Sequence, residues 1–170
     1  MGRDENNWSE EGNIMKIATY NIWNSEAGMF ARKKAIQKEI LDVGADVICL
    51  QEVEDCELAE MIAGQTGFKF LFFQAYENGN EGLCIVSKIP LDKRESWCHD
   101  VNAIYADFYY QARRVAIVNL HLPWDSVWER EQQIMEVVSR INEHSFDIAF
   151  LLGDFIKWNM VFHCVYSAYS

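Results

Sequence analysis

The chain has 170 residues with a formal net charge of −11; half of the residues are hydrophobic and 24% are charged. This composition fits one globular domain and excludes a chain that is disordered throughout. The acidic balance argues against binding that draws its affinity from a phosphate backbone, although a metal ion can supply the missing positive charge in an enzyme.

The cysteines and the amino-terminal segment indicate where the chain works. The number of cysteines, five, is odd, and no pair has the spacing of a zinc site. Cys49 and Cys84 lie within apolar runs, so we interpret them as buried free thiols of a reduced, cytoplasmic protein. The sequence has no apolar run of membrane-spanning length. The polar start does not resemble a signal peptide, and we expect residues 1–14 to be a disordered extension.

Strand and helix patterns alternate from Met15 onward. Apolar runs predict strands over residues 15–22, 47–53, 68–73, 83–86, 104–110, 114–120 and 149–153. Apolar residues at helical spacing predict helices over 32–43 and 56–65. The run at 47–53 is continuously apolar before its polar end, which is typical of a strand covered on both faces.

A third helix is predicted after Ser126. Ser126 and Glu129 have the spacing of a capping box, which satisfies free N–H groups at a helix start. Its predicted inward stripe consists of Val127, Ile134, Val138 and Ile141. The complete order of elements predicts a mixed α/β domain in which helices pack on a sheet.

Four predicted strands end in polar residues. Asn21 follows the first strand, Glu52 the second, and His121 and Asp154 follow two later ones. Functional groups gather at strand ends when helices cover the faces of a sheet, so we expect these side chains to form one cluster.

Oxygen donors of this kind suit Mg²⁺ or Mn²⁺ rather than Zn²⁺. Glu52 would be a direct metal ligand, and Asn21 would bind the metal through its amide oxygen or hold a metal-bound water. His121 would donate a hydrogen bond to a phosphate oxygen, and Asp154 would orient a water molecule. The implied reaction is metal-assisted phosphoester hydrolysis.

Each of the four residues also has an ordinary structural interpretation. Asn21 is compatible with a turn, Glu52 with a solvated strand end, His121 with a structural histidine and Asp154 with a helix cap. Their occurrence at four strand ends favours the functional interpretation. For Trp124 and Trp128, packing in the core is favoured over stacking on a substrate.

Five motifs, in this order, are similar to those of the endonuclease/exonuclease/phosphatase superfamily, which is deoxyribonuclease I-like. They are ATYNIW, ICLQEV, EGLCIVSKIPL, IVNLHLPW and FLLGDF, within residues 15–155. The resemblance implies a four-layer α/β sandwich and an Mg²⁺-dependent phosphoester hydrolase, with Mn²⁺ as an alternative metal. It assigns Asn21 and Glu52 to the metal site, and His121 and Asp154 to catalysis.

The resemblance ends at Phe155. Ile156 stands where the family motif GDFN has its Asn, and Ile can neither bind a metal nor orient a water. The later Asp-His pair of the family has no counterpart in residues 156–170. We therefore expect residues 15–155 to be a partial family domain, about the first half to two-thirds of the fold, followed by a tail that does not belong to it.

A partial domain would be impaired or inactive as a phosphodiesterase or endonuclease-like enzyme. We also expect that the missing strands leave one sheet face uncovered, which would promote self-association. The alternative is a non-catalytic half-domain that acts as a binding or dimerisation module. The substrate class stays open between a small phosphodiester, a lipid headgroup and a nucleic acid.

Overall fold

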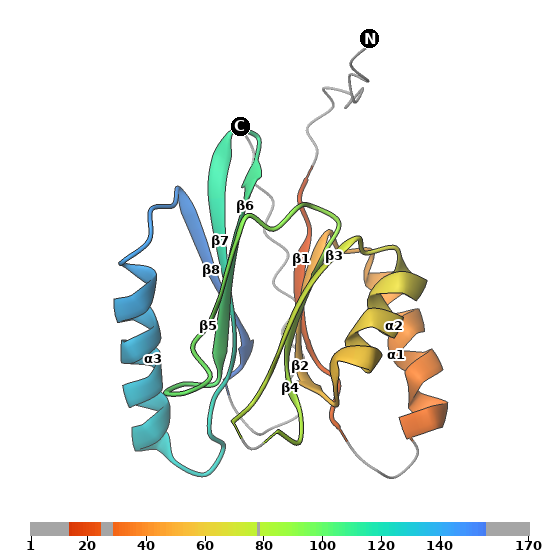
Figure 1. Ribbon diagram of the computed structural model, residues 1–170, viewed down its shortest axis with the longest axis horizontal. Coiled ribbons are helices and arrows are strands. Elements are labelled where there is room, and N and C mark those ends of the chain that lie inside the picture. Colours follow the sequence, from red (N-terminus) through yellow and green to blue (C-terminus); the bar gives the residue numbers. More distant parts are fainter. Residues whose placement is uncertain (1–13, 25–28, 78, 156–170) are drawn as a thin grey trace.

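Two four-stranded sheets lie at the centre of the computed structural model, which describes residues 14–24, 29–77 and 79–155 (Figure 1). The first sheet contains, in spatial order, β1 (Ile17–Asn21), β2 (Val47–Val53), β4 (Gly82–Ser87) and β3 (Phe70–Ala75). The second contains β5 (Lys93–Ser96), β6 (Ala103–Tyr110), β7 (Arg113–His121) and β8 (Ile148–Asp154). The pairs β1–β2 and β7–β8 are parallel, and the other neighbours are antiparallel.

Helices cover the outer face of each sheet, which gives four layers. They are α1 (Met29–Val43) and α2 (Cys56–Thr66) on the first sheet and α3 (Val127–Ile141) on the second (Figure 1). The Asp55 and Ser126 side chains cap α2 and α3 by accepting hydrogen bonds from the backbone N–H groups of Leu58 and Glu129. Among the described helices, none has the length and apolar character that crossing a membrane requires.

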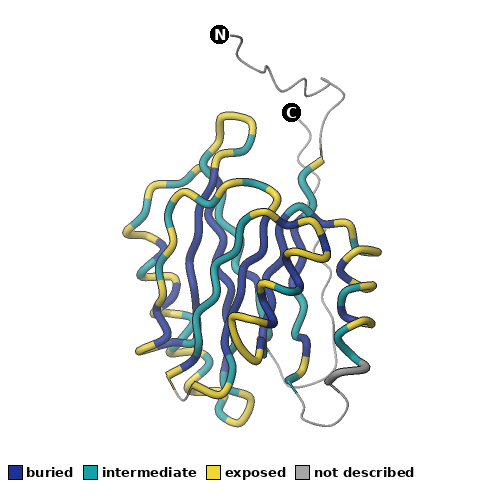
Figure 2. The backbone as a smooth tube through the Cα atoms, turned by 45° about the vertical axis from the view of Figure 1, so that its right-hand side comes forward, coloured by how far each residue is buried: buried dark blue, intermediate teal, exposed yellow. Residues whose placement is uncertain are grey.

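The central strands β2, β4, β6 and β7 are mostly buried because they contact a neighbouring layer on both faces. In β2, Ile48 and Leu50 pack with the residues of α1 and α2, whereas Val47 and Cys49 pack against the second sheet. This arrangement explains the continuous apolar run of β2, since neither face meets water. Figure 2 shows the buried strands in the interior, with exposed backbone concentrated in helices and loops.

The expectation of an uncovered sheet face is wrong for the central strands of the first sheet. The second sheet is built from residues 93–154 and packs on this face. Its contributions to the shared core include Ile104, Ala106, Phe108, Val115, Ile117 and Leu152. The strands that cover the face therefore precede Phe155, and the basis for predicting association through this face falls away.

The predicted inward stripe of α3 is only partly correct. Ile141 is buried and Ile134 is partly buried, but Val127 is 63% exposed and Val138 is 40% exposed. Val137 is the buried residue instead, at 1%. Positions 137 and 138 both satisfy helical spacing with Ile134 and Ile141, so the pattern alone did not distinguish them.

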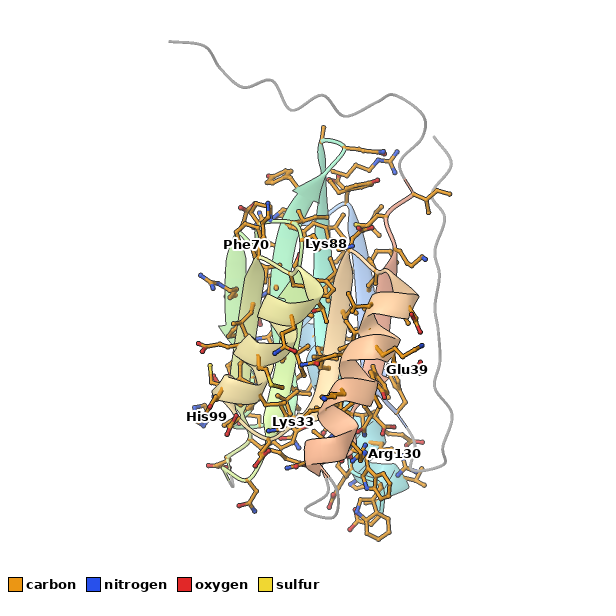
Figure 3. The ribbon with its side chains drawn as sticks, turned by 90° about the vertical axis from the view of Figure 1, so that its right-hand side faces the viewer. Lys33, Glu39, Phe70, Lys88, His99 and Arg130 are labelled. Atoms are coloured by element: carbon orange, nitrogen blue, oxygen red, sulfur yellow. The ribbon has the colours of Figure 1, made fainter. Side chains whose placement is uncertain are left out.

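The prediction that Trp124 and Trp128 pack in the core is also wrong, because both side chains are more than half exposed. The sequence pattern missed β5, whose residues Lys93–Ser96 are polar and form an edge strand beside β6. Charged residues occupy the outer side of α1, as expected for a surface helix, and Figure 3 shows Glu39 there.

Candidate active site at the strand ends

The carboxyl-terminal ends of four strands meet at one edge of the two sheets. Asn21 ends β1, Glu52 lies near the end of β2, His121 ends β7 and Asp154 ends β8. His121 and Asp154 are paired in the β7–β8 ladder, and β1 contacts β8 across the sheets. The structure thus brings together all four residues that the sequence predicts for the site.

Glu52 has an unusual backbone conformation that aims its side chain at this edge. Its φ of 57° lies in the left-handed region, and the β2–β4 register shifts between Leu50 and Val53. Such an irregularity redirects a side chain that would otherwise alternate with the strand, and it is common beside functional sites. The backbone N–H of Asn24 donates to Glu52 Oε2 at 3.0 Å and holds the carboxylate in place.

Asn21 lies between the two carboxylates. Its Nδ2 donates to Glu52 Oε1 at 2.8 Å and to Asp154 Oδ2 at 2.9 Å. Its Oδ1 accepts a hydrogen bond from the Trp23 backbone N–H at 2.8 Å. In this arrangement Asn21 bridges the carboxylates through its amide nitrogen, and its role as an oxygen ligand of a metal stays a prediction.

His121 faces Glu52 with one ring nitrogen and Tyr76 with the other. Its Nε2 lies 3.8 Å from Glu52 Oε1, and its Nδ1 lies 2.8 Å from the Tyr76 hydroxyl. The His121 backbone N–H donates to the Asn102 carbonyl at 2.9 Å. We call Asn21, Glu52, Tyr76, His121 and Asp154 the strand-end cluster.

Sequence reasoning missed Tyr76 because it follows the aromatic strand β3 and precedes a turn-rich segment. A tyrosine there is expected to be a packing residue. It is 7% exposed, and burial raises its pKa above the usual range, with a further rise from the negative charge of Glu81. A hydrogen bond from the Glu52 backbone lowers the pKa of Tyr76, but it offsets only part of this rise. The phenol therefore stays protonated at neutral pH.

Glu81 adds a third carboxylate beside the cluster. Its pKa is raised, first by burial and then by the negative charge of Glu52, while a hydrogen bond with Asn24 opposes the rise. In the sequence, Glu81-Gly82 directly precedes a strand, a position typical of a turn rather than of a site residue. The effect of Glu52 on Glu81 indicates that negative charge is concentrated at this edge of the sheets.

Two buried amides support the cluster from behind. Gln51 Nε2 donates to Thr19 Oγ1 at 3.0 Å and to Asn119 Oδ1 at 2.6 Å, which joins the two sheets. Asn119 Nδ2 donates to the carbonyls of Leu50 and Cys84 at 2.8 and 2.9 Å. Gln51 and Asn119 are almost completely buried, so this satisfied network fixes the strands that carry Glu52 and His121.

Gly153 allows β8 to approach β7 closely just before Asp154. Its φ is 148°, and a Cβ atom added there would lie 1.8 Å from the Leu120 carbonyl oxygen. No larger residue fits without moving the backbone of one strand. The Gly-Asp pair that closes the apolar run therefore serves both the packing of the strands and the placement of the Asp154 carboxylate.

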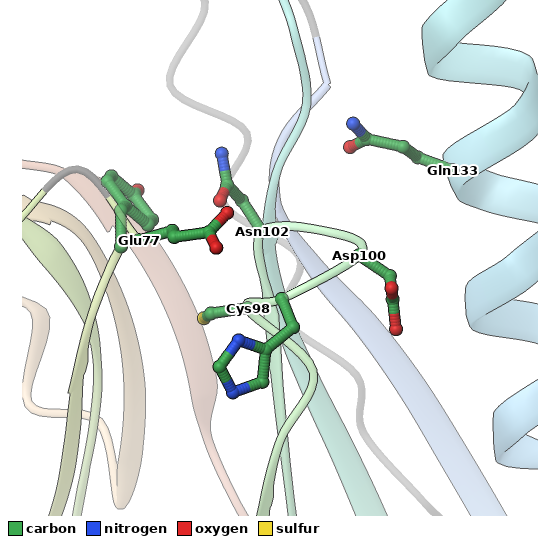
Figure 4. Close-up of a pocket in the computed structure, with 7 residues that line it drawn as sticks. Glu77, Cys98, Asp100, Asn102 and Gln133 are labelled. Atoms are coloured by element: carbon green, nitrogen blue, oxygen red, sulfur yellow. The ribbon is translucent and has the colours of Figure 1, made fainter.

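A surface pocket of about 470 Å³ opens beside the cluster. Its lining consists of Tyr76, Glu77, Cys98, His99, Asp100, Asn102 and Gln133 (Figure 4). Tyr76 and Asn102 also contact His121, so pocket and cluster share a wall. The buried Oε1 of Gln133 has no hydrogen-bond partner among the described residues. Asp100, in contrast, is paired with Arg140.

The donors of the cluster fit a hard divalent cation. Glu52 and Asp154 offer carboxylate oxygens to one shared amide group, which shows that they converge. Within the described ranges, no group of three or more His, Cys, Asp or Glu side chains forms a metal-binding set. Mg²⁺ commonly uses one or two protein carboxylates and keeps several water molecules, so a site centred on Glu52 matches its chemistry.

Two face-packed sheets between layers of helices, with a carboxylate, amide and imidazole cluster at one edge, define a deoxyribonuclease I-like α/β sandwich. A model of the Endonuclease/Exonuclease/phosphatase family matches residues 18–155. The chain belongs to this family, whose members are phosphoester hydrolases. Comparison with curated proteins gives no match.

Solved structures confirm the fold. TDP2 from D. rerio, complexed with a single-strand DNA product, is 16% identical with a TM-score of 0.67, over 83% of this chain and 60% of that one. A functionally unknown protein from Enterococcus faecalis V583 is 19% identical with a TM-score of 0.67, over 83% and 66%. Beta toxin from Staphylococcus aureus is 15% identical with a TM-score of 0.65, over 83% and 65%. The chain thus spans less than two-thirds of the length of each structure.

Proposed function

We propose that this chain carries the phosphate-binding part of a divalent-metal-dependent phosphoester hydrolase, of the phosphodiesterase or endonuclease type. The observation that carries the proposal is the convergence of Glu52 and Asp154 on the Asn21 amide, with His121 Nε2 3.8 Å from Glu52. Four strands, from different parts of the sequence, bring these groups to one point. Purely structural roles for each residue do not require this convergence.

Each residue then has a role that follows from its chemistry. Glu52 would hold Mg²⁺, or Mn²⁺ in its place, with Asn21 as a second ligand or as the holder of a metal-bound water. When bound, the metal polarises the phosphoryl group and offsets its negative charge. Asp154 orients the attacking water through its carboxylate, and His121 donates a hydrogen bond from Nε2 to a phosphoryl oxygen.

The surroundings favour a small phosphodiester or lipid headgroup over a long nucleic acid. Among the described residues, the lining of the neighbouring pocket contains two carboxylates, from Glu77 and Asp100, and no Lys or Arg. Arg32, which is close to the site, donates its hydrogen bonds to the carbonyls of Ile22 and Trp23. A nucleic acid remains the second candidate, because the similar TDP2 structure holds a single-strand DNA product. The free thiols of Cys49 and Cys84 support a reducing, cytoplasmic setting.

The residue after Phe155 bears on the rate. Ile156 lies outside the described residues, and its aliphatic side chain lacks the hydrogen-bonding groups of the Asn in the family motif. We therefore propose that this chain is a slow enzyme and that Ile156→Asn increases hydrolysis. The alternative, a non-catalytic binding module, predicts metal binding with no hydrolysis in either form.

The test is hydrolysis of bis-p-nitrophenyl phosphate with Mg²⁺ or Mn²⁺, compared with the same protein in chelator. Glu52→Gln should abolish the metal-dependent rate, while Glu95→Gln, at a remote and partly exposed carboxylate, should leave it unchanged. Hydrolysis that survives Glu52→Gln or chelator would overturn the proposal. So would the absence of metal-dependent hydrolysis in both the unaltered chain and Ile156→Asn.

A further inference from the structure

Tyr76 is held firmly against His121. The two ring centroids lie 5.9 Å apart at 47°, and the hydroxyl oxygen is 2.8 Å from His121 Nδ1. The backbone at Tyr76 is fixed by its N–H, which donates to the Glu81 carbonyl, and by its carbonyl, which accepts from the Gly79 N–H. Because the side chain is buried and the backbone is hydrogen-bonded, the Tyr76 hydroxyl is held in a fixed position against His121 Nδ1.

A neutral imidazole carries its proton on one nitrogen, and the two choices differ in energy here. With the proton on Nδ1, that N–H would donate to Tyr76, and the lone pair of Nε2 would face the Glu52 carboxylate. With the proton on Nε2, the Tyr76 hydroxyl donates to Nδ1, and the Nε2–H faces the negative carboxylate. The second arrangement gives each ring nitrogen a favourable partner. It also avoids the repulsion between the Nε2 lone pair and the Glu52 carboxylate that the first arrangement would have.

The Tyr76 hydroxyl is suited to be the donor. A tyrosine hydroxyl carries its proton at neutral pH, so it can donate to a nitrogen lone pair. Among the described residues, His121 Nδ1 is the acceptor within hydrogen-bond distance of this hydroxyl. The group on the far nitrogen of a histidine commonly decides which nitrogen presents its proton to a site.

We propose that Tyr76 is a positioning residue that holds His121 in the tautomer with the proton on Nε2. This inference rests on the proposed function, because it gives His121 the N–H that would meet a phosphoryl oxygen. Tyr76 itself stands behind the imidazole and acts through it. Loss of a residue that orients a functional histidine typically lowers activity ~10–100-fold.

The first test reads the tautomer directly by ¹⁵N NMR of the imidazole nitrogens, in unaltered protein and Tyr76→Phe, at a pH where the rings are neutral. We expect a single Nε2–H tautomer for His121 in the unaltered protein and a mixture in Tyr76→Phe, with His144 unchanged. A His121 proton on Nδ1, or a tautomer that does not respond to Tyr76→Phe, would overturn the inference.

The matched control is Tyr105→Phe, which also removes a buried phenol oxygen with a 2.8 Å hydrogen bond, in this case to Asp107. It should leave the His121 tautomer unchanged. In hydrolysis, Tyr76→Phe should lower kcat by ~10–100-fold with KM unchanged, and Tyr105→Phe should preserve kcat per folded molecule. An unchanged kcat in Tyr76→Phe would contradict a positioning role.

The two readouts separate the two proposals, because the tautomer is measured without substrate or metal. A tautomer that responds to Tyr76→Phe, in a protein that never hydrolyses phosphoesters, would overturn the proposed function and leave the contact intact. Metal-dependent hydrolysis that Tyr76→Phe does not alter would overturn the role of Tyr76 and leave the proposed function intact.

Discussion

The strand-end cluster has a counterpart elsewhere in the molecule that contains the same kinds of side chain. On the α3 side of the second sheet, His144 stacks on Tyr105 at 4.3 Å and lies 3.3 Å from Glu95. Tyr105 donates to Asp107, which also accepts from Arg114. We call these five residues the distal cluster. Both clusters combine a tyrosine, a histidine and two carboxylates.

The two clusters differ in how their charge is compensated. Within the distal cluster, Arg114 pairs with Asp107 at 2.7 Å. The adjacent residue Lys93 pairs with Glu95, also at 2.7 Å. In the strand-end cluster, Glu52 has no Lys or Arg partner among the described residues and instead faces the His121 imidazole at 3.8 Å, while Glu81 adds further negative charge. The paired charges of the distal cluster indicate a structural role, whereas the unbalanced negative charge around Glu52 is consistent with the metal site proposed above.

The largest effect on stability is therefore expected in the distal cluster. Asp107 is fully buried, and Asp107→Ala leaves Arg114 and the Tyr105 hydroxyl without their acceptor. Arg114 is about a third exposed, so the loss should lie at the lower end of the roughly 3–5 kcal/mol that removing one partner of a fully buried ion pair costs, and the free energy of unfolding in urea should fall by about 3 kcal/mol. The affinity for Mn²⁺ per folded molecule should not change. A loss below about 1 kcal/mol would show that the Asp107–Arg114 pair contributes no more than an ordinary exposed ion pair.

A smaller effect is expected for Glu52→Gln, and only when metal is present. Without metal, the substitution removes repulsion between Glu52 and Glu81 but also weakens the hydrogen bonds that the Glu52 carboxylate accepts. These two effects oppose each other, so the free energy of unfolding should change little. With metal at ten times its Kd, the unaltered protein should be stabilised by about 1.4 kcal/mol and Glu52→Gln should not be. Thermal or urea unfolding with and without Mg²⁺ measures this difference. Equal stabilisation of both proteins by the metal would show that the metal binds at a site that does not include Glu52.

The smallest effect concerns pH and Glu95. Burial pushes the pKa of Glu95 up, but hydrogen bonds from Lys93 and Trp97 and the charges of His144 and Lys93 outweigh it and lower the pKa. A lowered pKa in the folded state contributes stability above the unfolded value of about 4.3, and this contribution disappears as the pH falls through the folded value. The side chain is about a third exposed, so the contribution should stay below about 1 kcal/mol.

Urea unfolding of the unaltered protein and Glu95→Gln, compared between about pH 6 and pH 3, isolates this contribution because other carboxylates titrate in both. The stability difference in favour of Glu95 should shrink as the pH falls. A difference that grows toward low pH would show that the pKa of Glu95 is raised on folding.

The sequence predicted the members of the strand-end cluster that stand at the ends of predicted strands. Asn21, Glu52, His121 and Asp154 occupy such positions, and strand ends meet at sheet edges. Tyr76 and Glu81 were not predicted, because their approach to the cluster depends on how the turn between β3 and β4 folds back. No sequence pattern encodes that contact.

The distal cluster was missed for a similar reason. Asp107 sits within an aromatic strand, and its partner Arg114 lies next to the β6–β7 turn, where a charged side chain is ordinarily solvated. Their contact follows from the β6–β7 register, in which the residues lie close on the same side of the sheet. The expectation of an uncovered sheet face was wrong because the strands predicted over residues 104–153 were not assigned to a second sheet that packs on the first.

The central claim is that the strand-end cluster binds a divalent cation through Glu52. The most direct measurement is paramagnetic broadening by Mn²⁺ in the ¹H–¹⁵N spectrum of the labelled protein. The account predicts that the amide signals of Asn21, Glu52, His121 and Asp154 broaden first, that Glu52→Gln shifts this to higher Mn²⁺ concentration, and that the distal cluster is unaffected. Broadening that begins elsewhere, or that is identical in Glu52→Gln, would contradict it.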